Sequence, residues 1–342
     1  MANPIRVLVV DDSVFMRNAL SRNIESDRRF KVIDTAFNGH DGVEKAIRLK
    51  PDVVTLDVEM PVMNGIDALK AIVSKTSIPV IMVSAVTENG ARTTMEALEI
   101  GAVDFIPKAK GAELIHEKLL AAVSANLARA PQAGRGPIRV ASPSAAARSA
   151  PLTLQFKPKI IVVGSSTGGP QALQDVIKQL PANLPVPVVV AQHMPPQFTL
   201  ALAKRLDATC PPKVVEATDG APLTPGTVYI GPGGMHLRVT QTNLKVEQDK
   251  GESLYKPSVD VLAESVLATF GKNVLGVMLT GMGNDGMREF VKLRKNGAYI
   301  IVQDSASCVV YGMPKAVADA GCANDILPVD KIGPRIREAL RI

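Results

Sequence analysis

The sequence predicts an α/β protein made of two doubly wound domains with mainly parallel sheets. Its 342 residues suggest about two domains. Short β-branched apolar runs alternate with helix-like segments along most of the chain, a rhythm typical of βαβ units whose strands are buried on both faces. A stretch rich in Ala, Ser, Pro and Arg interrupts this rhythm. We therefore expect an N-terminal domain over 1–127, a linker over 128–157 and a C-terminal domain over 158–342.

Composition excludes several classes of protein. The chain is 46% hydrophobic and 21% charged, which favours folded domains over disorder. No run of about 18 apolar residues is present, so we expect no membrane insertion, and the N-terminus does not resemble a signal peptide. The three cysteines lie far apart and form no CxxC pair, which predicts a reducing, cytoplasmic location.

The net charge of +6 is not evidence for a nucleic-acid partner. Most of the excess lies in the predicted linker, which contains five basic residues and no acid: Arg129, Arg135, Arg139, Arg148 and Lys157. A basic linker is a weaker signal than a basic face on a folded domain. We therefore expect no nucleic-acid partner.

Five strands are predicted in the N-terminal domain, and polar residues follow them. The strands are Ile5–Val10, Phe30–Ala36, Asp52–Asp57, Pro79–Ser84 and Val103–Ile106. In a doubly wound sheet, ligands bind at the carboxyl ends of the strands. Five polar residues fall there: Asp11, Asp12, Asp57, Ser84 and Lys108.

Three acids at one edge predict a site for a hard divalent cation such as Mg²⁺. An Asp beside Mg²⁺ and a Lys can accept a phosphoryl group, because both cations neutralise phosphate oxygens. The simpler alternative is that Asp11, Asp12 and Ser13 cap the first helix. The five residues together favour the site.

Residues 1 to about 125 resemble a response-regulator receiver domain, which has a flavodoxin-like fold. The matching segments are Val10-Asp11-Asp12-Ser13, Leu56 to Pro61, Val83-Ser84-Ala85 and Asp104 to Lys108. The resemblance implies that Asp57 is the phosphoacceptor and that Asp12, Asp57 and the main-chain carbonyl of Glu59 hold Mg²⁺, with Asp11 in support. It also implies switch roles for Ser84, Phe105 and Lys108. The family usually has Pro after this Lys; here Ala109 follows, which leaves Lys110 as a rival.

The α/β pattern resumes at Lys159. Predicted strands are Ile160–Val163, Pro187–Ala191, Thr227–Ile230, Val274–Leu279 and Ala298–Val302, with a hairpin of Leu237–Thr240 and Leu244–Glu247. After the first strand, Gly164-Ser165-Ser166-Thr167-Gly168 fits G-x-S-x-G, a strand-to-helix turn that presents a nucleophilic Ser. The following helix N-terminus supplies N–H groups suited to an oxyanion.

A nucleophilic Ser needs a base and an orienting acid. His193 and Asp285 are the best candidates, because each follows a predicted strand and therefore lies at the same sheet edge as Ser166. His236, Asp260 and Asp304 are reserve candidates. Two other interpretations remain open at this point: the Gly-rich turn could hold a phosphate, although it lacks the Walker Lys and GxGxxG spacing, and Asp285 could simply cap a helix.

Residues from about 158 to 340 resemble the catalytic domain of the CheB family of protein-glutamate methylesterases, a three-layer α/β serine esterase. The matching segments are GSSTGGP, AQHMPPQFT, GPGGMHL, KPSVDVL, LTGMGNDG and YGMP. The resemblance implies that Ser166 is the nucleophile, His193 the base and Asp285 the acid. It places Thr167 and Met282 at the oxyanion.

The two resemblances together imply a phosphorylation-activated hydrolase in chemotactic adaptation. Its substrates would be glutamate γ-methyl esters of methyl-accepting chemotaxis receptors, with methanol released, and selected receptor glutamines would be deamidated. A sensor histidine kinase would supply the phosphoryl group, Mg²⁺ would be needed in the receiver, and ester hydrolysis would need no cofactor. A nucleotide-binding C-terminal domain and a scaffold with an inactive esterase are the alternatives.

Overall fold

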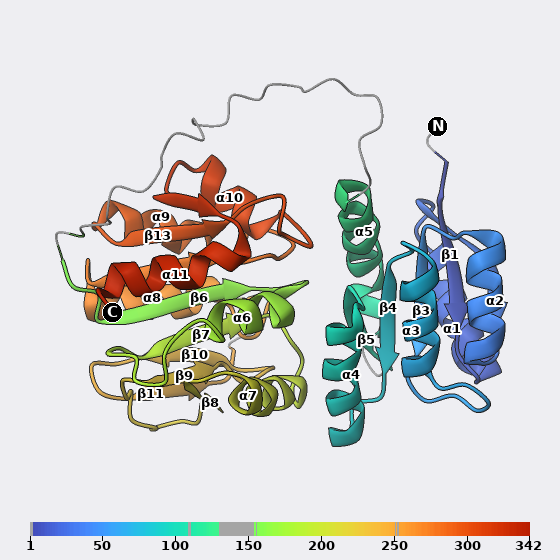
Figure 1. Cartoon of the computed structure of the whole chain (residues 1–342), viewed down its shortest axis with the longest axis horizontal. Helices are drawn as coiled ribbons and strands as arrows, with labels where there is room; N and C mark the ends of the chain where they lie inside the picture. Colours follow the sequence, from blue (N-terminus) through green and yellow to red (C-terminus); the bar gives the residue numbers. More distant parts are fainter. Residues whose placement is uncertain (1–2, 109–110, 130–153, 155, 250, 252) are drawn as a thin grey trace.

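A computed structural model describes residues 3–108, 111–129, 154, 156–249, 251 and 253–342, and leaves out the side chains of 111–114 and 125–129. It contains two α/β units side by side (Figure 1). Almost all of the predicted linker 128–157 lies outside the described residues. Two ends of that range are described: the helix from the N-terminal unit runs to Arg129, and Leu154 is buried against the C-terminal unit.

The N-terminal sheet is parallel, with the strand order β2-β1-β3-β4-β5. All five predicted strands are present within one residue of their expected ends: β1 Ile5–Val10, β2 Phe30–Ala36, β3 Val53–Asp57, β4 Val80–Ser84 and β5 Asp104–Pro107. Five helices cover the two faces of the sheet: α1 Val14–Glu25, α2 Gly39–Leu49, α3 Gly65–Lys75, α4 Glu88–Ile100 and α5 Gly111–Arg129. The alternate apolar side chains of each strand form two cores, one on each face.

The C-terminal sheet has seven parallel strands in the order β14-β13-β12-β6-β7-β9-β8. These strands are β6 Ile160–Ser165, β7 Val188–Gln192, β8 Lys213–Glu216, β9 Thr227–Ile230, β12 Val274–Met278, β13 Tyr299–Gln303 and β14 Asp325–Leu327. The predicted hairpin is present as β10 His236–Val239 and β11 Leu244–Glu247. The two edge strands β8 and β14 were not predicted. Each has only three or four residues and no continuous apolar run, so the sequence signal is weak.

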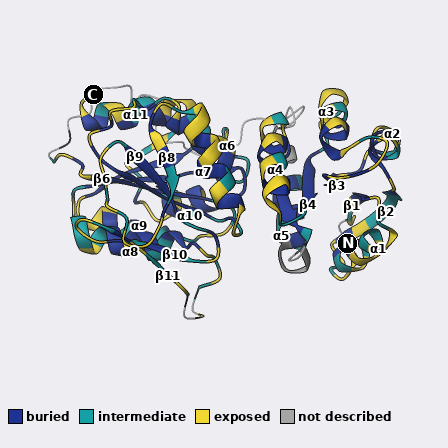
Figure 2. Cartoon of the chain, turned by 90° about the horizontal axis from the view of Figure 1, so that it is seen from below, coloured by how far each residue is buried: buried dark blue, intermediate teal, exposed yellow. Residues whose placement is uncertain are grey.

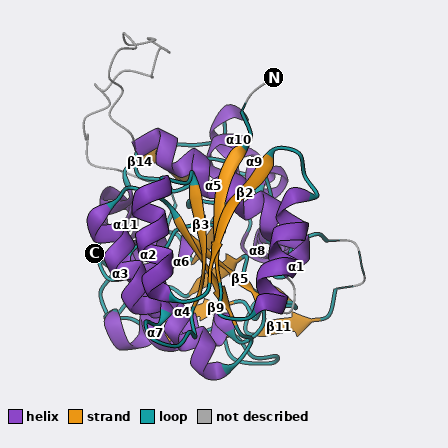
Figure 3. Cartoon of the chain, turned by 90° about the vertical axis from the view of Figure 1, so that its right-hand side faces the viewer, coloured by secondary structure: helices purple, strands orange, loops and turns teal. Residues whose placement is uncertain are grey.

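Helices lie on both faces of this sheet, which gives three layers (Figure 3). One core joins the sheet to α6 Gly169–Ile177, α7 Phe198–Thr209 and α11 Val329–Leu340. The other joins it to α8 Val259–Phe270, α9 Met287–Lys295 and α10 Met313–Asp319. The five central strands β13, β12, β6, β7 and β9 are buried along their whole length (Figure 2), and the predicted doubly wound α/β class is confirmed for both units.

The two units meet where α4 packs against α6 and α7 (Figure 1). Phe105 of β5 stacks on Phe198 of α7 with ring centroids 4.4 Å apart. The exposed rim of this contact carries the ion pairs Lys204–Glu88 and Arg205–Glu99. The N-terminal unit is therefore held against the C-terminal unit by an apolar centre and a charged rim.

Candidate active site and its regulatory domain

Three adjacent strands at the middle of the C-terminal sheet lead to the predicted nucleophile, base and acid. Ser166 follows β6, His193 follows its neighbour β7, and Asp285 lies beyond β12 on the other side of β6. The strand that follows β6 in the chain, β7, lies on one side of it, and the later strand β12 lies on the other side. The strand order therefore reverses at β6, and open α/β sheets bind ligands at such a switch point. The backbone N–H of Ser166 donates to the Thr280 carbonyl at 3.0 Å, which joins the β6 and β12 loops.

The imidazole of His193 is paired with Asp285. Its Nε2 lies 2.7 Å from a carboxylate oxygen of Asp285, and both side chains are less than 10% exposed. The carboxylate also accepts the Ser258 hydroxyl at 2.9 Å and the backbone N–H groups of Val259 and Asp260 at 2.7 and 3.1 Å. Burial alone would raise the pKa of Asp285, but these hydrogen bonds, led by the one with His193, hold it below its ordinary value. Asp285 is thus a carboxylate suited to orient the imidazole.

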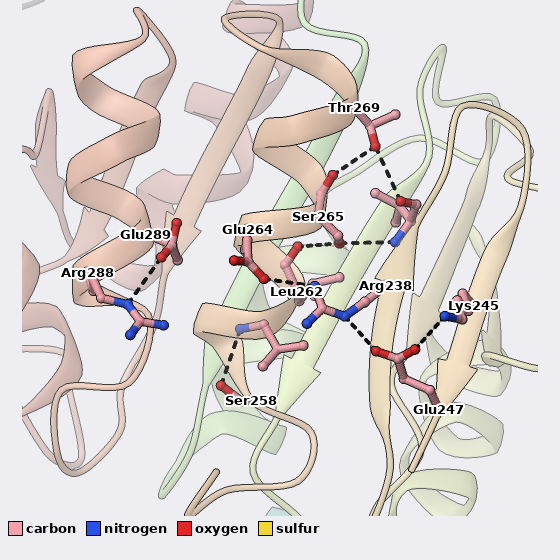
Figure 4. Close-up of polar contacts among 12 residues, drawn as sticks. Arg238, Lys245, Glu247, Ser258, Leu262, Glu264, Ser265, Thr269, Arg288 and Glu289 are labelled. Atoms are coloured by element: carbon pink, nitrogen blue, oxygen red, sulfur yellow. Dashed lines mark hydrogen bonds and ion pairs between the residues drawn. The ribbon is translucent and has the colours of Figure 1, made fainter. Parts of the chain in front are cut away.

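The first turn of α8 supplies the hydrogen-bond donors that hold the Asp285 carboxylate. Polar contacts in turn fix α8 against the β10–β11 hairpin (Figure 4). The Ser258 hydroxyl caps α8 by accepting the Val261 N–H. Farther along the same helix, Glu264 pairs with Arg238 of β10 at 2.8 Å, and Ser265 accepts the N–H of Val239 at 3.0 Å. The hairpin therefore fixes α8, and α8 holds the carboxylate.

Ser166 and His193 line one cavity of about 370 Å³. The Nδ1 atom of His193 is buried and is among the described side-chain atoms that lack a hydrogen-bond partner. With Nε2 directed at Asp285, Nδ1 is the nitrogen left to accept a proton. An unpaired buried ring nitrogen is costly unless a partner arrives during function.

Sequence reasoning missed Gln192, which holds the Ser and His loops together. Its side-chain oxygen accepts the Ser165 hydroxyl at 2.6 Å, and its amide donates to the carbonyls of Ser166 and His193 at 2.9 and 3.1 Å. A Cβ at Gly169 would lie 1.9 Å from that same oxygen, so only glycine fits there. The available signal was its place at the end of a strand, directly before His193.

The two residues predicted at the oxyanion lie on loops beside Ser166. A Cβ added at Gly281 would meet Ser166 Cβ at 2.8 Å, which brings the Met282 loop close to the nucleophile. Within the described chain, no acceptor is recorded for the backbone N–H of Thr167 or Met282. The Thr167 hydroxyl is engaged: it donates at 2.6 Å to Asp104 of the N-terminal unit.

The reserve candidates have other partners. His236 accepts the N–H of Ser258 at 3.3 Å and pairs with Asp249 at 3.2 Å. Asp260 accepts the N–H of Glu289, and Asp304 accepts the N–H and hydroxyl of Ser307. The structure therefore places none of the three directly against His193.

The acidic pocket of the N-terminal unit forms at the carboxyl edge of its sheet. Ligand atoms of Asp11, Asp12 and Asp57 lie within 4.8 Å of one another, and Asp11 and Asp57 are buried. Lys108 donates to Asp57 at 2.7 Å and lies 3.3 Å from Asp11. Burial, reinforced by the neighbouring Asp11, raises the pKa of Asp57 to about 6 despite the hydrogen bond from Lys108. Crowded, buried carboxylates of this kind fit a divalent cation with oxygen ligands.

The predicted switch residues lie in or just after β4 and β5: Ser84 ends β4, Phe105 lies within β5 and Lys108 directly follows β5. The Ser84 hydroxyl is buried at the end of β4 and donates to the Gly90 carbonyl at 3.2 Å. Phe105 is buried under Phe198, as described above. Lys108 contacts the acids, whereas its rival Lys110 lies outside the described residues.

The N-terminal unit borders the Ser166 cavity directly. Phe105, Pro107, Glu117 and Lys118 line it together with Ser166 and His193. The docked N-terminal unit therefore narrows the space around Ser166, which is itself only partly exposed.

Comparisons with known proteins agree with both halves. Residues 161–336 match the family model for the CheB methylesterase, and residues 7–120 match that for the response regulator receiver domain. The chain is 43% identical to a protein-glutamate methylesterase/protein-glutamine glutaminase of Oleidesulfovibrio alaskensis, over 98% of this chain and 99% of the relative. A protein of the same name from Vibrio cholerae is 42% identical, over 97% and 98%. The crystal structure of the Thermotoga maritima CheB methylesterase catalytic domain is 39% identical and covers 55% of this chain and all of that chain, with a TM-score of 0.52.

A receiver domain joined to an α/β domain with Ser, His and Asp at its switch point defines a response regulator with hydrolase output. The chain belongs to the CheB methylesterase family. It is an enzyme of the protein-glutamate methylesterase/protein-glutamine glutaminase class, with a receiver domain for regulation by phosphorylation. Among the described residues, no helix is both long and apolar enough to cross a bilayer.

Proposed function

We propose that Ser166, His193 and Asp285 form the catalytic triad and hydrolyse γ-methyl esters of receptor glutamates. His193 Nδ1 takes the Ser166 proton as the hydroxyl attacks the ester carbonyl, and Asp285 stabilises the imidazolium through Nε2. The imidazolium returns its proton to the leaving methoxide, which departs as methanol. Water then hydrolyses the acyl-enzyme and leaves a glutamate.

The Thr167 and Met282 N–H groups would stabilise the oxyanion of the tetrahedral intermediate. An amide passes through a similar intermediate, with ammonia in place of methanol. The same site would therefore deamidate selected receptor glutamines, in line with the double name of the relatives.

Regulation would begin with phosphoryl transfer from a sensor histidine kinase to Asp57. Asp11, Asp12, Asp57 and the Glu59 carbonyl would hold Mg²⁺, which would neutralise phosphate oxygens together with Lys108. Phosphate at Asp57 would draw the Ser84 hydroxyl inward and let Phe105 move from Phe198. The docked domain would then leave the cavity. A cytoplasmic location and the absence of a nucleic-acid partner remain predictions.

The observation that carries this proposal is the buried His193–Asp285 pair: Nδ1 of His193 has no hydrogen-bond partner among the described residues, and His193 lines the same cavity as Ser166. A fluorophosphonate probe, which reacts with activated serines, tests it. The full chain should be labelled at Ser166, and Ser166→Ala should abolish both labelling and ester hydrolysis. Hydrolysis that survives in Ser166→Ala would refute the triad, and methylated receptor left intact by unlabelled wild type, in a preparation that the probe does label at Ser166, would refute the substrate assignment.

A further inference from the structure

Tyr255 lies flat against the imidazole of His193. The ring centroids are 4.1 Å apart and the planes differ by only 6°. Tyr255 belongs to the loop just before α8, whose first turn holds Asp285. The base and its acid are therefore both supported from one short segment.

This stacking supplies a restraint that the polar contacts lack. Among the described atoms, His193 has one ring hydrogen bond, from Nε2, and Nδ1 has no partner. A single hydrogen bond does not by itself fix the plane of the imidazole, and the direction of Nδ1 depends on that plane. A parallel aromatic neighbour fixes the plane and also favours the imidazolium, because the face of a tyrosine ring attracts a cation.

The receiver domain contacts the same tyrosine. The Tyr255 hydroxyl donates to Glu117 of α5 at 3.2 Å. Burial, reinforced by the Glu117 carboxylate, raises the pKa of Tyr255 to about 12, so the phenol stays protonated and remains a donor. One side chain thus touches the catalytic histidine with its ring and the receiver with its hydroxyl.

We propose that Tyr255 is a positioning residue for His193 and that Glu117 restrains the same side chain while the receiver is docked. The proposal rests on the proposed function, since it assigns His193 the role of base. The ring acts on catalysis, and the hydroxyl acts on docking. Separate substitutions can therefore divide the two roles.

The test uses the full chain with and without acetyl phosphate and Mg²⁺. In the phosphorylated protein, Tyr255→Leu should lower kcat for methylated receptor on the order of tenfold or more, with little change in KM. Tyr255→Phe should recover most of that loss, because it keeps the ring. In the unphosphorylated protein, Tyr255→Phe and Glu117→Ala should each raise the rate, because each removes the bond to the receiver.

A spectroscopic measurement keeps the test independent of turnover. The His193 ring protons, identified by their loss in His193→Gln, should show an upfield ring-current shift that Tyr255→Leu removes and Tyr255→Phe retains. An unchanged kcat in Tyr255→Leu, or a loss confined to KM, would overturn the positioning role, and so would an unchanged His193 signal. Failure of the proposed function would show differently, as absence of Ser166 labelling in the wild type.

Discussion

The hydroxyl of Thr167, the residue after the nucleophile, donates at 2.6 Å to Asp104 of the receiver. Asp104 also pairs with Lys118 at 2.7 Å, and its side chain and that of Thr167 are buried. The regulatory domain thus reaches within one residue of Ser166 and shares a charge-assisted hydrogen bond with the loop predicted to hold the oxyanion. A contact between the two domains therefore lies directly beside the predicted nucleophile.

Thr167→Val should raise the activity of the unphosphorylated full chain. The change keeps the shape of the side chain and removes a hydrogen bond to a charged group, worth about 1.5–3 kcal/mol, so a rise of about ten- to a hundredfold is expected. The phosphorylated protein should change little, since the proposed undocking would already have broken the bond there. A fall in both states, measured as methanol release, would mean that the hydroxyl serves catalysis instead of docking.

The charged rim of the interface should make basal activity depend on salt. Arg205 and Glu99 form an exposed ion pair, which is worth about 0.2–1 kcal/mol and is screened by salt. Arg205→Glu should raise the basal rate about two- to fivefold.

The charge-swapped double variant Arg205→Glu/Glu99→Arg is the matched control, because it restores the pair. Its basal rate should return toward that of the wild type. Additive effects in the double variant would show that the two side chains do not interact in solution.

Replacement of the two buried histidines of the C-terminal domain should separate their roles. His193→Gln should lower the rate of hydrolysis on the order of 10⁴-fold, because members of a triad act as a unit. His236→Asn keeps an acceptor for the Ser258 N–H and should remain active. Rates on methylated receptor, with circular dichroism as a check on folding, decide the assignment; an active His193→Gln beside an inactive His236→Asn would reverse it.

Asp57→Asn should keep basal hydrolysis and lose stimulation by acetyl phosphate. The phosphoryl group adds about −1.5 to −2 charges at pH 7 next to Ser84 and Lys108, and the amide cannot accept it. Chelation of Mg²⁺ with EDTA should remove stimulation from the wild type in the same way and leave its basal rate intact. Loss of basal hydrolysis on chelation would place a metal in the esterase site.

The sequence was sufficient to predict the two sheets and the strand ends that carry the site. Apolar runs mark the buried parallel strands, and residues directly after such strands meet at one edge. Chain position offered a signal for Gln192, at a strand end, but none for the roles of Tyr255 or Asp104, because those roles come from contacts between loops and between domains. The short edge strands β8 and β14 were not predicted for a related reason: their pairing is set by neighbouring strands and not by a local sequence pattern.

The central claim is that the docked receiver covers a working triad. The most direct test is the rate at which a fluorophosphonate labels Ser166. The full chain is compared before and after treatment with acetyl phosphate and Mg²⁺, and a fragment of residues 154–342 sets the limit for an uncovered site. The account predicts slow labelling at Ser166 that phosphorylation accelerates up to, but not beyond, the rate of the fragment. Equal labelling in all three samples would contradict it, and so would labelling at a different serine.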